Sequence, residues 1–227
     1  MEKIYIETYG CSLNFADSET MAGILKEEGY QIVDNLEDAN LIIINTCTVK
    51  GPTDNNFKKR LKELPKVPII ISGCIPQSQY GKLKELKEHS LIGPHQLKRI
   101  GEVVEESLNG NIVILLAEEE HDNLTMPHIR KNDFIEIIPI SSGCLGNCTY
   151  CLTKKARGNL ISYSPELILE RARKAIQQGV KELWITSQDN GAYGLDINTN
   201  LPELLKKILA INGNYKVRLG MANPNHI

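Results

Sequence analysis

The sequence predicts an α/β protein with parallel strands. Short apolar runs alternate with segments of helical periodicity along most of its 227 residues. Two of these runs, LIIIN and PIIIS, are continuously apolar, which is typical of strands buried on both faces of a sheet. The composition is 41% hydrophobic and 24% charged, close to the globular average. A disordered or collagen-like chain is thereby excluded.

The first hundred residues repeat a strand–helix rhythm. Strands are expected at Lys3–Thr8, Leu41–Asn45 and Pro68–Ser72. Helices are expected at Asn14–Glu28, Asn55–Leu64, Ser78–Glu88 and Gln96–Leu108. For the first helix, Asp17 or Ser18 is a plausible cap, and Gly29 ends it. This rhythm predicts a parallel sheet with helices between its strands.

A second block of the same kind begins after a polar stretch over 117–133, which is expected to be a linker. Its strands are expected at Phe134–Ile140, Lys181–Thr186 and Tyr215–Gly220, and its helices at 165–178 and Leu201–Ala210. Pro165 after Ser164 is typical of a helix start. The block is well short of the ~250 residues of a (β/α)8 barrel. We therefore expect the first part of a barrel, in a fragment of a longer protein.

The net charge and the absence of targeting signals in the sequence restrict the possible functions and location of the protein. The net charge is −2, so a generically nucleic-acid-coating domain is excluded, while a local RNA contact stays open. No run approaches the ~20 apolar residues of a membrane span, and the amino terminus has no apolar signal core. A cytoplasmic location, where thiols stay reduced, is expected. The six cysteines are then expected to be metal ligands or catalysts.

Three cysteines in the second block, Cys144, Cys148 and Cys151, form the strongest motif (the second triad). They directly follow a predicted strand, where active sites of β/α folds lie. Three thiolates suit a soft metal or an iron–sulfur cluster, and they leave one position open for chemistry. The alternative is a zinc knuckle, although only one C-x2-C unit is present and no histidine lies nearby.

The other three cysteines, Cys11, Cys47 and Cys74, form the first triad. Each follows directly upon a predicted strand. Because parallel strands end at one edge of a sheet, the three thiols are expected to converge there. The alternative is that they are small buried core residues. Near them, Asn14 is either a hydrogen-bonding partner of a ligand or a plain helix cap.

These motifs resemble the radical S-adenosylmethionine methylthiotransferases. SGCLGNCTYC followed by KKARGNLISYSPE carries the resemblance, and YGCSLNFADSE, INTC and SGC match the family's amino-terminal domain. The resemblance covers essentially the whole chain. SQDNGAYGLDI and LTKKARG resemble the archaeal and eukaryotic branch, which acts on tRNA bearing N6-threonylcarbamoyladenosine beside the anticodon.

The resemblance implies three parts. An amino-terminal parallel α/β domain, Rossmann- or flavodoxin-like, is expected at 1–112, a linker at 113–132, and a partial radical S-adenosylmethionine core at 133–227. The rest of the barrel and a carboxy-terminal RNA-binding domain are expected to lie outside the given sequence. The basic residues Lys154, Lys155 and Arg157 either meet tRNA phosphates or lie in a solvated loop.

The resemblance also implies a site. Each triad holds one 4Fe-4S cluster, and S-adenosylmethionine binds the open iron at the second triad. The side chains expected to contact S-adenosylmethionine are Tyr150, Ser187, Gln188 and Asp189. Tyr150 is otherwise an ordinary packed tyrosine. No residue is assigned as catalytic, and the sulfur and electron donors stay unassigned.

The implied reaction converts threonylcarbamoyladenosine in tRNA to its 2-methylthio derivative. One alternative keeps the chemistry and changes the substrate to isopentenyladenosine in tRNA or to a ribosomal protein side chain. A second alternative is a non-catalytic chain that carries iron–sulfur clusters as a scaffold or electron carrier.

Overall fold

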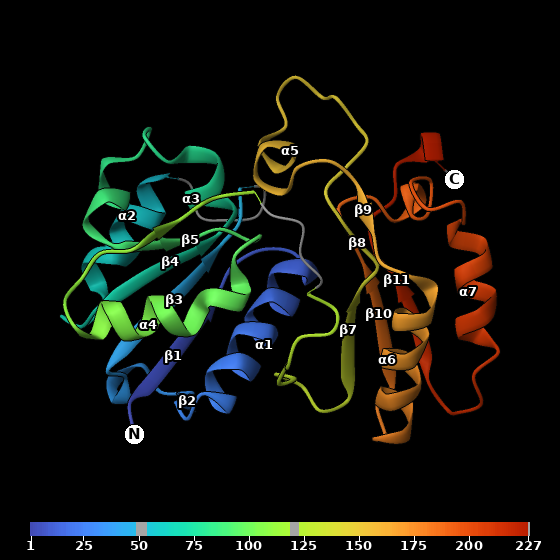
Figure 1. Ribbon diagram of the computed structural model, residues 1–227, viewed down its shortest axis with the longest axis horizontal. Coiled ribbons are helices and arrows are strands. Elements are labelled where there is room, and N and C mark those ends of the chain that lie inside the picture. The colour runs from blue at the N-terminus through green and yellow to red at the C-terminus, as the bar shows by residue number, and fades with distance from the viewer. Residues whose placement is uncertain (49–53, 119–122, 227) are drawn as a thin grey trace. The chain divides into compact units, whose positions relative to one another are not determined.

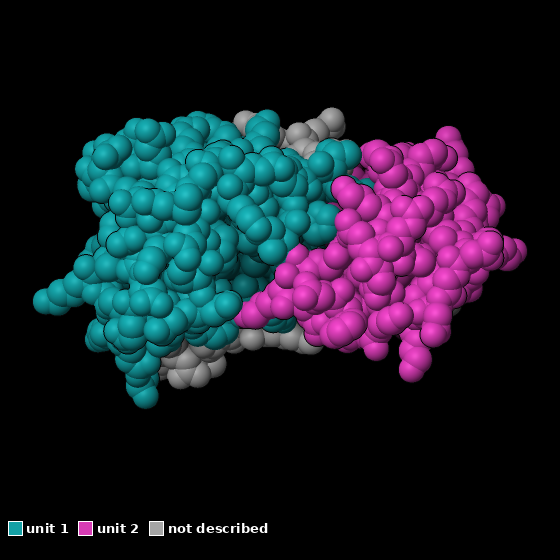
Figure 2. Space-filling view, turned by 90° about the horizontal axis from the view of Figure 1, so that it is seen from below, with its two compact units in different colours: residues 1–129 teal, residues 130–227 magenta. Residues whose placement is uncertain are grey.

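The computed structural model describes residues 1–48, 54–118 and 123–226. The chain forms two compact units, 1–129 and 130–227, which Figure 2 shows in different colours. Within the described ranges, no helix has both the length and the apolar character that a membrane crossing requires.

The first unit is built on one parallel sheet of six strands, in the order β2-β1-β3-β4-β5-β6 (Figure 1). The strands are β1 (Lys3–Thr8), β2 (Gln31–Val33), β3 (Leu41–Thr46), β4 (Ile69–Gly73), β5 (Ser90–Ile92) and β6 (Ile114–Leu115). All neighbouring pairs are parallel. The strand order reverses between β1 and β3, and such a switch point is where α/β sheets bind ligands.

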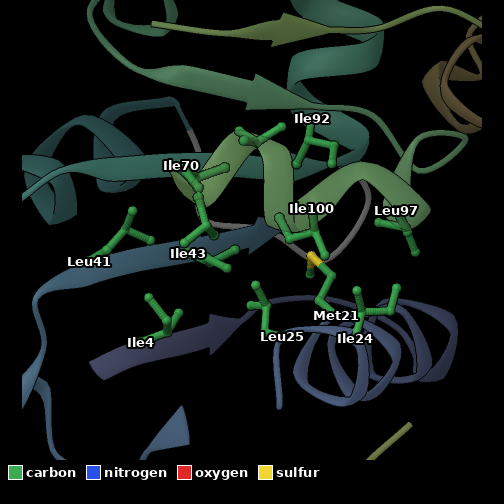
Figure 3. Packing of buried hydrophobic residues seen from close by; sticks show 12 residues of the cluster. Ile4, Met21, Ile24, Leu25, Leu41, Ile43, Ile70, Ile92, Leu97 and Ile100 are labelled. Atoms are coloured by element: carbon green, nitrogen blue, oxygen red, sulfur yellow. The ribbon is translucent and has the colours of Figure 1, made fainter. Parts of the chain in front are cut away.

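Helices cover both faces of this sheet. They are α1 (Ser12–Glu27), α2 (Asp54–Glu63), α3 (Cys74–Gln79) and α4 (Ile100–Leu108), with short 3-10 turns at Leu36–Asp38, Lys84–Glu88 and Leu97–Arg99. Ile43 packs with residues of α1 and α4 (Figure 3). Its neighbours Ile42 and Ile44 pack on the opposite face with Phe57 of α2. Burial on both faces explains why this strand is continuously apolar.

Several local predictions for this unit are wrong. The first helix begins at Ser12 with Cys11 as its N-cap, so Asp17 and Ser18 are buried inside it and cap nothing. In place of one helix over 78–88, α3 ends at Gln79 and a 3-10 turn follows later. Gly81, with φ +91°, lies between the two.

Part of the linker expected at 113–132 belongs to the first unit. Strand β6 lies within that range and pairs with β5 through only two residue positions, too few for an alternation pattern to be visible. Further on, the Ile129 amide donates to the Glu19 carbonyl of α1 at 2.9 Å. The segment before it packs on the same helix, because a Cβ added at Gly23 would lie 2.4 Å from the Pro127 backbone.

The second unit contains a parallel sheet of three strands in the order β11-β10-β7. Its strands are β7 (Ile135–Pro139), β10 (Glu182–Thr186) and β11 (Lys216–Leu219), and its longer helices are α6 (Pro165–Gln177) and α7 (Leu201–Leu209). A two-stranded hairpin, β8 (Ser141–Ser142) with β9 (Ile161–Ser162), follows β7 and encloses the short helix α5 (Leu152–Arg157). Short 3-10 turns lie at Asn190–Ala192 and Pro224–His226. The predicted start of α6 is confirmed, because Ser164 Oγ accepts from the Leu167 amide at 3.3 Å.

Candidate functional site

The first triad lies along the carboxyl edge of the six-stranded sheet. Cys11 follows β1 and caps α1, Cys47 follows β3, and Cys74 follows β4 and opens α3. These three strands are neighbours, and Thr46 pairs in register with Gly73. Cys11 and Cys47 flank the switch point, so the expected grouping of the three strand ends is what the topology produces.

Two glycines allow the cysteine-bearing segments to approach closely. Gly10 has φ +126°, and a Cβ placed on it would lie 2.5 Å from Cys47 Cβ. Gly73 has φ +90°, and its Cβ would lie 2.4 Å from the Thr46 carbonyl oxygen. Both the positive φ and the contact distances require a residue without a side chain.

The surroundings of the first triad combine buried thiols with polar partners. Cys47 is 5% exposed and Cys74 is 3% exposed. The Cys11 thiol donates to Asn14 Oδ1 at 3.3 Å. Of the two roles weighed for Asn14, the structure supports the contact with a cysteine, because the cap position is held by Cys11 itself.

An ion pair lies just before Cys11. Arg60 of α2 donates to both carboxylate oxygens of Glu7, with Nε at 2.9 Å and Nη2 at 2.5 Å, and the Tyr9 hydroxyl donates to the same carboxylate. Burial opposes the charge of Glu7, but the hydrogen bonds from Arg60 and Tyr9 outweigh it and lower the pKa of this carboxyl. Burial and the bond to Glu7 raise the pKa of Tyr9 to about 12.

The second triad lies on the loop that the β8–β9 hairpin closes. The Cys144 amide donates to the Gly158 carbonyl at 3.2 Å, and the Cys151 amide donates to the Cys148 carbonyl at 3.0 Å. Gly143 has φ +73°, and a Cβ there would lie 1.8 Å from the Asn159 carbonyl oxygen. The hairpin therefore brings the two ends of the loop together only because Gly143 has no side chain.

Two thiols of the second triad lie around one backbone amide. The Gly146 N–H donates to Cys144 Sγ at 3.2 Å, and a Cβ on Gly146 would lie 3.4 Å from Cys144 Sγ and 4.0 Å from Cys148 Sγ. Hydrogen bonds of this kind tune cluster sulfurs and their cysteine ligands. The backbone thus forms a cradle with two sulfur donors beside an N–H, and Cys151 caps α5 next to it.

All six cysteines lie in the described part of the chain, and none of them forms a disulfide. Among the described residues, no three His, Cys, Asp or Glu side chains lie in an arrangement that could hold a metal ion.

The residues expected to contact S-adenosylmethionine have different surroundings. Tyr150 is 86% exposed, so it is not the packed tyrosine of the alternative interpretation. Asp189 is buried and accepts from the Gly191 amide at 3.1 Å and the Asn223 amide at 2.9 Å. Its other oxygen is 2.6 Å from His226 Nδ1. Asp189 thus fastens the segment after β11 to the end of β10.

Buried polar atoms without hydrogen-bond partners gather at the same strand ends. Within the described chain they include the hydroxyls of Ser141, Ser142 and Ser187 and Oε1 of Gln188. The two segments are adjacent, because the Ile140 amide donates to the Thr186 carbonyl at 3.0 Å. Such unsatisfied groups are costly, so they indicate a place for a polar ligand.

Ser141, Ser142 and His226 were not singled out from the sequence. The two serines lie at a strand end directly before the second triad, and that position was the available signal. His226 had no signal, because its partner Asp189 is 37 residues away.

The three basic residues expected to meet tRNA phosphates or to lie in a solvated loop have different surroundings. Arg157 is only 2% exposed, so it fits neither role. The Lys154 ammonium is partly exposed and donates to the Cys144 carbonyl of the same loop. Lys155 is exposed and fits both roles.

Comparison with known proteins assigns both halves of the chain. Residues 3–93 match the family described as "Uncharacterized protein family UPF0004", and residues 138–224 match the radical SAM superfamily. The human protein named threonylcarbamoyladenosine tRNA methylthiotransferase is 46% identical over 100% of this chain and 41% of its own length. A protein of Pyrococcus horikoshii, named as a probable enzyme of the same kind, is 40% identical over 100% of this chain and 54% of its own. The chain spans about half the length of these curated relatives.

Solved structures support the fold class. The radical S-adenosylmethionine methyltransferase TsrM from Kitasatospora setae superposes with a TM-score of 0.60 at 12% identity, covering 91% of this chain and 51% of that one. The cobalamin-dependent S-adenosylmethionine radical enzyme OxsB gives 0.56 at 13% identity, covering 96% and 38%. At these identities the likeness concerns the fold alone, and it confirms the predicted α/β architecture.

The resemblance inferred from the cysteine motifs is also confirmed. It extends to animal and archaeal relatives alike. The chain carries a UPF0004 domain followed by a radical SAM domain, and along its whole length it is similar to the threonylcarbamoyladenosine tRNA methylthiotransferases.

Proposed function

We propose that this chain is part of a radical-type methylthiotransferase that converts threonylcarbamoyladenosine in tRNA to its 2-methylthio derivative. The observation that carries the proposal is the presence of two cysteine triads in one chain, the first after the parallel strands β1, β3 and β4 of one unit and the second on the loop between β8 and β9 of the other. The names of the animal and archaeal relatives support the substrate.

The second triad is proposed to hold a 4Fe-4S cluster with S-adenosylmethionine, and the first triad to hold another 4Fe-4S cluster. Three thiolates fit a four-iron cluster with one iron left for an outside ligand. When bound, such a cluster with S-adenosylmethionine supplies one-electron chemistry, which substitution at the unactivated C2–H of adenine requires.

The chain's own side chains are proposed to orient S-adenosylmethionine. Ser187, Gln188 and the paired serines before the second triad offer buried hydroxyl and amide groups that have no partner within the described chain. Tyr150 offers an exposed ring beside Cys151 for the adenine. Asp189 contributes by holding the Asn223 and His226 segment against β10.

The proposal is tested on tRNA nucleosides. A strain that lacks the gene is expected to lose the 2-methylthio derivative of threonylcarbamoyladenosine, and the wild-type gene is expected to restore it. Genes with either triad changed to alanine are expected to restore nothing. An unchanged nucleoside profile in the deletion strain contradicts the tRNA assignment. Loss of a different 2-methylthio nucleoside, or of a ribosomal protein modification, instead identifies the alternative substrates.

The non-catalytic alternative is separated by a chemical assay. The full-length protein is reconstituted anaerobically and given dithionite and S-adenosylmethionine. Formation of 5′-deoxyadenosine, measured by chromatography, is expected. If none forms while both clusters are present, the clusters serve only as a scaffold or electron carrier. A cytoplasmic location, where tRNA is modified, is part of the same proposal.

A further inference from the structure

Two fully buried asparagines lie between the strand ends that carry the first triad. Asn14 of α1 and Asn45 of β3 are both 0% exposed. Asn14 Nδ2 donates to Asn45 Oδ1 at 3.3 Å, and Asn45 Nδ2 donates back to the Asn14 carbonyl at 2.8 Å. The side chains therefore interlock α1 with β3 beside the switch point of the sheet.

The same network reaches every segment that carries a cysteine of the first triad. Asn14 Oδ1 accepts from the protonated Cys11 thiol at 3.3 Å, a bond that ends when Cys11 becomes a thiolate ligand. Asn14 Nδ2 donates to the carbonyl of Thr46, the residue before Cys47, at 2.9 Å. Thr46 Oγ1 donates to the Ser72 carbonyl at 2.6 Å and accepts from the Ile75 amide at 3.3 Å. Ser72 and Ile75 lie on either side of Cys74.

Every amide hydrogen of the pair is used. The Asn14 side-chain amide donates its two N–H groups to Asn45 Oδ1 and the Thr46 carbonyl. The Asn45 side-chain amide donates its two to the Asn14 carbonyl and to Ser18 Oγ, the latter at 2.9 Å. Burying amides is unfavourable unless all their hydrogen bonds are made, and a network with all its bonds made fixes one arrangement of the groups it joins. An apolar pair would fill this space without defining the positions of three separate segments.

We propose that Asn14 and Asn45 are positioning residues that fix the spacing of the three cysteine-bearing segments, and thereby retain the cluster at the first triad. This inference rests on the proposed function, which places a 4Fe-4S cluster there. Loss of the network then loosens the ligand set without removing any ligand. Changes in such outer partners typically weaken metal sites about 10–100-fold.

The test uses the full chain in which the second triad is changed to alanine, so that only the first cluster can form. In this parent, Asn14→Ala, Asn45→Ala and the isosteric Asn14→Asp are compared after anaerobic reconstitution. Asn14→Asp keeps the volume, replaces the two N–H donors with a second acceptor and adds a negative charge, so the two alanine variants, which add no charge, carry the comparison. All three variants are expected to release iron to a ferrous chelator about tenfold faster than the parent, with an altered electron paramagnetic resonance spectrum of the reduced cluster.

Ser107→Ala is the matched control, because it removes a buried hydrogen bond of 2.7 Å to Ser90 at the start of β5, at the opposite edge of the sheet. It is expected to release iron at the parent rate, and its apo melting temperature should resemble those of the asparagine variants. Release at the parent rate with an unchanged spectrum in all three overturns the inference alone. A parent that binds no iron overturns the proposed first cluster itself. Unfolded asparagine variants beside a folded control also overturn the inference, because the amides then serve the fold as a whole.

Discussion

At the residue scale, hydrogen bonds stabilise the ionised carboxylate of Glu7 near the first triad. Its carboxylate is engaged by Arg60 and Tyr9, and the hydrogen bonds keep its pKa below the ordinary value of 4.5 despite burial. The folded state therefore binds fewer protons at Glu7 than the unfolded state does. This contribution to stability is present above pH 4.5 and is lost as the pH falls through the folded pKa.

Glu7→Gln removes this dependence. We expect the free energy of unfolding of the wild-type chain to fall more steeply below pH 4.5 than that of the variant. Denaturant titrations on both sides of this pH measure the difference. Glu27→Gln, at the exposed end of α1, serves as the control and should follow the wild type. Parallel curves for the wild type and Glu7→Gln would show that the ion pair does not shift the titration.

Gly143 tests the loop of the second triad at a single position. Gly143→Ala places a Cβ 1.8 Å from the Asn159 carbonyl oxygen in a backbone of φ +73°. The backbone must therefore shift, and the hydrogen bond from the Cys144 amide to the Gly158 carbonyl cannot keep its present geometry. In a chain with the first triad changed to alanine, we expect iron retention to fall severalfold. Leu145→Ala, a truncation on the exposed side of the same loop, should retain iron normally. Equal retention in the two variants is the contradicting result.

Some residue-level features were predictable and others were not, for a physical reason. The first triad was found because each of its cysteines follows an apolar strand, and the second triad because its three cysteines lie within eight residues after a strand. Both are local patterns. The Asn14–Asn45 pair joins positions 31 residues apart, so no local pattern reports it. Arg157 was expected outside because charged side chains are rarely buried, and only the folded loop shows otherwise.

At the element scale, α1 is covered on the side away from the sheet by the segment that ends at Ile129. The Ile129 amide donates to Glu19, and Gly23 contacts the backbone of Pro127 and His128. Long apolar strands and well-capped helices were predictable from periodicity and caps. The strands of two or three residues, β2, β5, β6, β8 and β9, were not, because pairing with neighbours rather than their own sequence defines them.

Gly23→Ala separates packing from helix propensity. Propensity alone would make alanine stabilising by about 1 kcal/mol. Because its Cβ would lie 2.4 Å from the Pro127 backbone, we expect destabilisation of about 1–3 kcal/mol instead. Chemical denaturation measures the sign, and Glu27→Ala on the same helix controls for propensity. A stabilised Gly23→Ala chain would mean that the segment before Ile129 does not pack on α1.

At the scale of the whole molecule, the chain joins two units that each carry three cysteines: the first triad follows the parallel strands β1, β3 and β4, and the second lies on the loop between β8 and β9. The α/β class was predictable because the strand–helix rhythm extends along the chain. The point where the units divide was harder to place, because the residues up to 129 have no strong periodicity and are held to α1 by packing. The second unit carries three parallel strands, as its sequence predicted.

Iron counting after anaerobic reconstitution tests the central claim most directly. Three full-length chains are compared: the wild type, the second-triad alanine variant and the first-triad alanine variant. Two independent four-iron clusters predict about eight, four and four irons per chain, with matching sulfide. Uptake of zinc in place of iron, or disappearance of all iron when either triad alone is removed, would contradict the claim that each triad holds its own cluster.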